Sequence, residues 1–99
     1  MDKQKISVPK ATLDFYVYEK DGLRFYEFDA TSVSAPEPMI NAFAGLAMLK
    51  RKNDRLVGRF FHKPLPLLQR ISNYFDWEEE EMENGDVRLT FRSKNNSIT

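Results

Sequence analysis

The sequence contains no cysteine, which excludes disulfide bonds, a thiolate metal site and a cysteine nucleophile. It also has no excess of either charge, because 15 Lys and Arg residues balance 15 Asp and Glu residues. This balance removes the electrostatic reason to expect binding to nucleic acid or to an anionic membrane surface. The chain has no long apolar run and no export signal at its start, so we expect a cytoplasmic protein without membrane contact.

Histidine is nearly absent as well, since His62 is the only one. A transition-metal site would therefore need carboxylates from the acidic run 78–81, but consecutive side chains on a strand point to opposite faces. Nothing in the pattern suggests that any carboxylate is buried, as a catalytic acid–base pair would require. We expect neither a metal nor a cofactor.

The 99 residues, 41% hydrophobic and 30% charged, predict one globular domain over 1–93 and a polar tail over 94–99. Two hairpins are expected from their turn residues. Lys20-Asp21-Gly22 separates alternating segments 13–19 and 24–29, and Asn84-Gly85 separates 77–82 from 87–92.

Apolar residues at helical spacing predict a helix over 36–50 and a second helix that starts near Pro64, with a strand over 56–62 between them. We expect Ala35 to cap the first helix, because Pro36 and Pro38 then occupy its first turn, where a missing N–H costs little. The order from residue 24 to 92 is β-α-β-α-β-β. It predicts an α+β two-layer sandwich with a mixed four-stranded sheet and both helices on one face, extended by an N-terminal strand and turn over 12–23.

A two-residue turn at Asn84-Gly85 would also fix the register of the last hairpin. It would place two glutamates, Glu78 and Glu80, on the apolar face of the hairpin, and this conflict stays open at the level of sequence. The facing pairs would be Glu81 with Arg88, Glu79 with Thr90, and Trp77 with Arg92.

Residues 28–39 read FDATSVSAPEPM, a strand ending in an apolar-Asp pair that leads through a short loop to Pro-x-Pro at a helix start. This segment resembles the TusA-like (SirA-like) sulfur-carrier proteins, whose first helix starts at Cys-Pro-x-Pro. The likeness extends over 24–92 in the order and length of the elements. The matching motif positions are Asp29, Pro36, Glu37 and Pro38.

Two departures decide what the resemblance implies. Ala35 stands where the carriers place cysteine, and Ser32 stands where they often place glycine. A cysteine at a helix start is a reactive thiolate, but Ala35 has no sulfur and cannot carry a persulfide. The segments 62–67 (HKPLPL) and 74–78 (YFDWE) are more similar to an uncharacterised, cysteine-less bacterial branch of this fold, a domain of unknown function.

If the two βα units are parallel, both helix starts lie at one edge of the sheet. Helix N-termini attract anions, so a small anion or an acidic partner residue would suit this edge. The prolines remove some N–H groups, and a lone histidine is often structural, so a purely structural edge remains the alternative. The candidate ligand residues around Ala35 are Ser32, Ser34, Glu37, His62 and Lys63.

Two further surfaces have both a functional and a purely structural interpretation. The strand 56–62 is apolar on both faces, so the sheet would meet a second copy or a protein partner unless the N-terminal strand and long polar side chains cover it. The basic segment 50–55 could contact nucleic acid, but the zero net charge favours an ordinary cationic helix end.

The sequence thus predicts a non-enzymatic binding domain of the TusA-like fold that lacks the carrier cysteine. The alternative is an accessory protein or enzyme of a redox, sulfur or nitrogen-oxide pathway that binds a small anionic ligand at the edge formed by His62 and Lys63.

Overall fold

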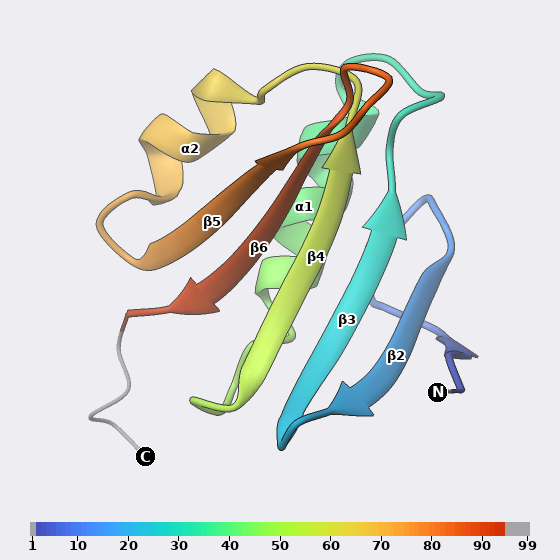
Figure 1. Cartoon of the computed structure of the whole chain (residues 1–99), viewed down its shortest axis with the longest axis vertical. Coiled ribbons are helices and arrows are strands. Elements are labelled where there is room, and N and C mark those ends of the chain that lie inside the picture. Colours follow the sequence, from blue (N-terminus) through green and yellow to red (C-terminus); the bar gives the residue numbers. More distant parts are fainter. Residues whose placement is uncertain (1, 95–99) are drawn as a thin grey trace.

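A computed structural model describes residues 2–94 as one mixed sheet with two helices (Figure 1). The strand order is β1-β2-β3-β4-β6-β5, in which β3 and β4 are parallel and all other neighbours are antiparallel. The α+β class is confirmed. The sheet has six strands and not four, because the expected N-terminal strand, β2, joins it and a further strand, β1, was not expected. The elements are β1 (Gln4–Ile6), β2 (Phe15–Lys20), β3 (Leu23–Asp29), α1 (Glu37–Leu46), β4 (Asp54–Phe60), α2 (Leu65–Ile71), β5 (Phe75–Glu81) and β6 (Val87–Ser93).

Both helices bury their apolar sides in one core against the sheet, and Figure 1 shows α1 behind the strands. Alternate residues of each strand reach this core because side chains on a strand alternate between the two faces. The other face of the sheet has no helix over it. The largest fully buried side chains include Phe15, Phe28, Leu56, Phe60, Leu67, Leu89 and Phe91.

The buried side-chain amide of Asn41 connects α1 to the segment before β2. Asn41 accepts hydrogen bonds from the N–H groups of Thr12 (2.9 Å) and Leu13 (3.0 Å) through its Oδ1 atom. Its Nδ2 atom donates to the Thr12 hydroxyl and to the Glu37 carbonyl oxygen. Asn41 is fully buried, so these bonds satisfy polar groups that would otherwise lack water.

The first hairpin forms at the expected position, and its turn consists of two residues, Asp21 and Gly22. Lys20 pairs with Leu23, and both turn residues have positive φ, 55° at Asp21 and 80° at Gly22. Positive φ at both positions defines the type I′ turn, whose twist matches that of the flanking strands.

The register expected for the second hairpin is wrong by one residue. The loop holds three residues, because the Met82 N–H donates to the Asp86 carbonyl oxygen and the left-handed residue Gly85 follows a turn. A shift of one residue moves every side chain to the other face. Trp77 therefore shares the core-side face with its partner Phe91, and the ion pair forms between Arg88 and Glu80 instead of Glu81.

The first helix is shorter than the expected 36–50. Its N-cap is Pro36 and not Ala35, since the Ile40 N–H already bonds to the Pro36 carbonyl oxygen. After Leu46 the chain leaves the helix, and the buried Asp54 carboxylate accepts the N–H groups of Lys50 and Arg51. The basic segment 50–55 therefore lies in a loop and at the start of β4, which corrects the expectation of a cationic helix end.

The remaining boundaries also move slightly. The expected strand 56–62 is β4, which ends at Phe60. The first strand of the second hairpin, β5, begins at Phe75 and not at Trp77, after α2 ends at Ile71. Of the expected tail 94–99, Lys94 alone lies within the described residues, and its N–H donates to the Tyr74 carbonyl oxygen. Neither helix of residues 2–94 is long and apolar enough to cross a membrane.

Candidate functional site

The two helix starts meet at one edge of the sheet because β3 and β4 are parallel. Their pairing continues one residue past the end of β3, where the Ala30 N–H donates to the Arg59 carbonyl oxygen of β4 at 2.9 Å. Each strand then leads through a short loop to a helix. Ligands of α/β sheets commonly bind at such a carboxyl edge.

A cleft of about 390 Å³ lies between these two loops, and we call it the helix-start cleft. Seven of its ten lining residues are apolar, which favours a ligand with an apolar body over a bare inorganic ion. The lining residues are Ala30, Val33, Ser34, Ala35, Pro38, Phe60, Phe61, His62, Lys63 and Pro64.

The structure brings four of the six sequence-predicted positions into this cleft: Ser34, Ala35, His62 and Lys63. Ser32 is exposed in the preceding loop and does not line it. The Glu37 carboxylate turns to the N-terminal segment, where it accepts a hydrogen bond of 2.7 Å from the Thr12 hydroxyl.

The cationic side of the cleft is only partly available. The Lys63 ammonium lies 2.9 Å from the Glu79 carboxylate of β5, so part of its charge is neutralised. The exposed His62 ring packs against Phe61 at 4.4 Å between centroids. Among residues 2–94, no hydrogen bond orients the His62 ring or connects it to Ser34, although a nucleophile–base pair needs such a bond.

Main-chain donors at the cleft are few. Four prolines lie in or next to the first turns of the two helices, and none has an N–H to offer an anion. Neither N-cap residue makes a side-chain hydrogen bond. An anionic group in the cleft would therefore rely on side chains at its rim. These prolines are Pro36, Pro38, Pro64 and Pro66.

A polar cluster that the sequence analysis missed lies beside the cleft. The Asp29 carboxylate accepts bonds from the Thr31 N–H (2.8 Å) and hydroxyl (2.6 Å), and the Arg59 guanidinium is 4.0 Å away. Burial raises the pKa of Asp29, but the Thr31 bonds and the Arg59 charge outweigh burial and hold that pKa below its ordinary value. The spacing Asp-x-Thr after a strand is a signal for this turn.

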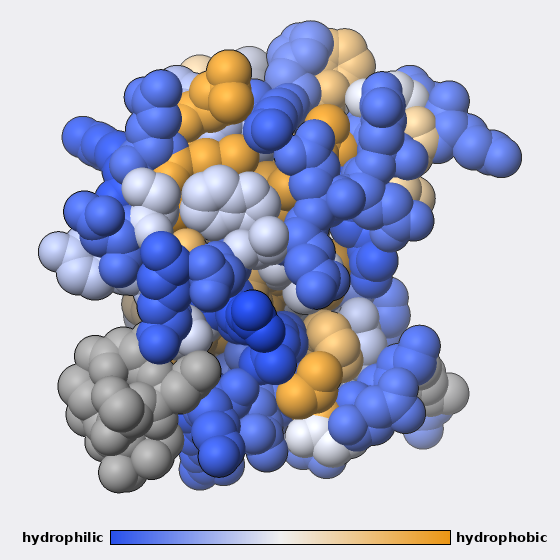
Figure 2. Space-filling model, turned by 60° about the vertical axis from the view of Figure 1, so that its left-hand side comes forward, coloured by the Kyte–Doolittle hydropathy of each residue, from blue (hydrophilic) through white to orange (hydrophobic). Residues whose placement is uncertain are grey.

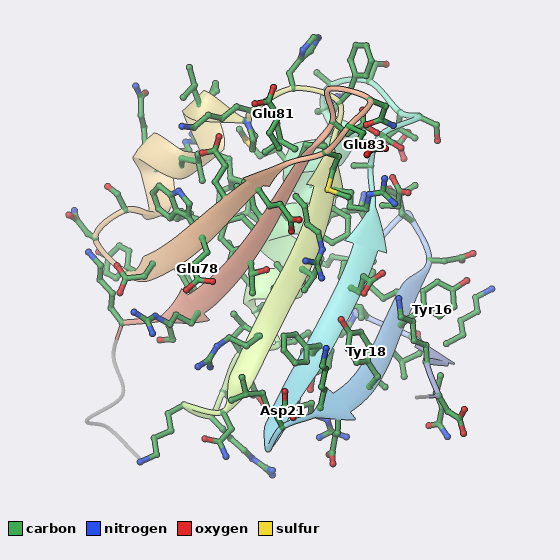
Figure 3. All side chains as sticks on the ribbon, in the orientation of Figure 1. Tyr16, Tyr18, Asp21, Glu78, Glu81 and Glu83 are labelled. Carbon is green, nitrogen blue, oxygen red and sulfur yellow. The ribbon has the colours of Figure 1, made fainter. Side chains whose placement is uncertain are left out.

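The sheet face without helices carries mainly polar side chains but includes one strip of apolar side chains. Val57 is only 1% exposed there, and Tyr18 stacks on Phe25 at 5.1 Å between ring centroids. Burial and the nearby Glu27 carboxylate raise the pKa of Tyr18, and Arg88 opposes them. Long side chains, among them those of four arginines, share this face with the apolar strip (Figure 3). These arginines are Arg55, Arg59, Arg88 and Arg92.

Within the described part of the chain, no three His, Asp or Glu side chains lie close enough together to hold a metal ion. Of the exposed large apolar side chains, Phe61 lines the helix-start cleft, and the others lie outside it, at Ile40, Phe43, Leu65 and Tyr74.

A scan against protein-family models gave no match, and searches of curated proteins and of solved structures found no significant match to this chain.

Proposed function

We propose that this chain is a non-enzymatic binding domain of the TusA-like fold without the carrier cysteine, and that its ligand occupies the helix-start cleft. The observation that carries the proposal is the meeting of Ser34 and Ala35 with His62 and Lys63 around one cleft, although 26 residues separate the two loops (36 to 61). The order of β3, α1, β4, α2, β5 and β6 supports the TusA-like assignment.

The chemistry of the cleft defines the ligand class. Its apolar walls suit a short aliphatic or aromatic body, and its volume is at the low end for small-molecule sites. Its rim offers a hydroxyl from Ser34, an imidazole from His62 and a partly neutralised ammonium from Lys63. We infer that the ligand of the cleft is a small monocarboxylate, or the last side chain and terminal carboxylate of another protein.

Binding is favoured over catalysis because Ala35, which lines the cleft, has no reactive group. An enzyme acting at the edge of His62 and Lys63 would need a partner that orients the imidazole. Among the described residues, the contact of His62 is the ring of Phe61, which cannot accept or hold a proton.

Titration of the ¹⁵N-labelled chain with hexanoate tests the proposal. We expect saturable amide shifts in both loops, weaker binding of hexanol, which lacks the charge, and of acetate, which lacks the apolar body. Ala35→Leu should fill the cleft and abolish binding, whereas Ala47→Leu, at an exposed position after α1, should not. Absence of saturable shifts, or unchanged binding by Ala35→Leu, contradicts the proposal.

A further inference from the structure

Strand β5 ends the sheet with an open main-chain edge. Its seven residues pair with β6 alone, and within residues 2–94 no main-chain hydrogen bond from a loop or turn reaches its outer side. Unpaired N–H and C=O groups along a strand are a template for another strand. The opposite edge, β1, offers only three residues. Figure 2 looks from the side of β5 and shows hydrophilic side chains with apolar ones between them.

The charge on this edge is negative and only partly compensated. Five of the seven residues of β5 are carboxylates, and the last four are all exposed. Glu78 and Glu81 form no ion pair or hydrogen bond among the described residues. Figure 3 shows Glu78 near the middle of β5 and Glu81 near its end. The other three carboxylates of β5 form ion pairs: Asp76 with Arg92 and Lys94, Glu79 with Lys63, and Glu80 with Arg88.

These charges disfavour the pairing of β5 with β5 of a second copy of the chain. A twofold pairing of β5 with itself, centred on Glu78, would place Glu78 opposite Glu78 and Asp76 opposite Glu80. Like charges directly opposite each other destabilise a strand pair. Three carboxylates of β5, those of Asp76, Glu78 and Glu80, lie in a row on the face without helices. This row would stabilise a neighbouring strand with basic side chains at alternate positions.

We propose that β5 binds an extended segment of another protein, with Lys or Arg at alternate positions, as the next strand of the sheet. Main-chain hydrogen bonds to the free edge of β5 provide affinity, and the carboxylates of β5 provide selectivity for a basic segment. Trp77, half-buried on the core-side face of the same strand, adds apolar contact for the residues between the basic ones. This edge and the helix-start cleft are different sites, so either proposal can fail alone.

The test uses the full chain and the peptide acetyl-KVKTKVK-amide. We expect saturable ¹⁵N amide shifts concentrated in Phe75–Glu81 and a loss of binding as ionic strength rises from about 0.01 M to about 1 M. Glu78→Gln with Glu80→Gln should weaken binding about three- to tenfold, because two exposed charge pairs on the face without helices are lost. The matched pair Asp2→Asn with Glu19→Gln, exposed and outside β5, should leave it unchanged.

A second peptide separates strand addition from mere charge attraction. The same sequence methylated on alternate main-chain nitrogens keeps every charge but loses the donors that face β5, so binding should fall by at least about tenfold. Equal binding of the methylated peptide overturns the proposal, as do shifts that avoid β5 or the absence of binding at low salt. Binding of acetyl-EVETEVE-amide would also overturn it.

Discussion

The ammonium of Lys63 lies 2.9 Å from the carboxylate of Glu79, so the loop before α2 is joined to the edge strand β5. This pair connects the rim of the helix-start cleft to the open edge of the sheet. It exists because Glu79 lies on the core-side face of β5, opposite Leu89, as a consequence of the three-residue hairpin loop.

We expect this ion pair to contribute little to stability. Both side chains are more than a third exposed, at 45% and 37%, and solvent screens such pairs. A double-mutant cycle with Lys63→Met and Glu79→Gln should give a coupling of about 0.5 kcal/mol or less in urea unfolding. A coupling well above about 1 kcal/mol would show that the pair is more shielded than its exposure indicates.

Asn41 should be far more important for stability. Asn41→Ala leaves the N–H groups of Thr12 and Leu13 without their acceptor beneath α1, and we expect a loss of about 2–4 kcal/mol in the free energy of unfolding. Asn73→Ala, at an exposed position, serves as the control and should change stability by less than about 0.5 kcal/mol. A small effect at Asn41 would mean that water replaces the amide.

Asp29 should stabilise the fold at neutral pH and lose this contribution in acid. Its pKa is lowered in the folded chain, so the stabilisation is present above the unfolded pKa of about 3.9 and is lost as pH falls through the folded value. The difference in unfolding free energy between wild type and Asp29→Asn should therefore shrink below about pH 4. NMR titration of the carboxyl carbon should show a higher pKa in Thr31→Val, which removes the hydroxyl bond.

Tyr18 should show the opposite dependence at high pH. Its raised pKa means that folding favours the protonated phenol, so its contribution is complete below the unfolded value of about 10 and is lost as pH rises through the folded value. Wild type should lose stability relative to Tyr18→Phe between about pH 9 and about pH 11. Glu27→Gln should move the Tyr18 titration to lower pH, and an unchanged titration would exclude Glu27 as a cause.

Local signals in the sequence predicted the first hairpin turn and the starts of both helices. Asp21-Gly22 specifies its turn because both residues take positive φ, and the prolines mark both helix starts within one residue. The helix-start cleft was foreseeable because parallel strands place their carboxyl ends together. Four of its lining positions follow from that argument alone.

The wrong predictions concerned features that are decided by packing and not by a local sequence pattern. Asn84-Gly85 fits a two-residue or a three-residue loop, and the burial of Trp77 against Phe91 decides for the longer one. In the observed register Glu78 and Glu80 lie on the face without helices, whereas Glu79 and Glu81 lie on the core-side face and are nevertheless exposed. Asn41 interrupts an apolar helical stripe, but its partners lie 28 and 29 residues earlier in the chain, which no local pattern reveals.

Strand β4 lies at the centre of the sheet but has no neighbour close to it in sequence. Its partner β3 is reached across α1, and its partner β6 across α2 and β5, whereas the flanking pairs β2–β3 and β5–β6 are local hairpins. Each hairpin can form early from its own turn, but the two halves become one sheet only when β4 docks between them. We therefore expect the cooperativity of unfolding to depend on β4 and the docking of β4 to limit the rate of folding.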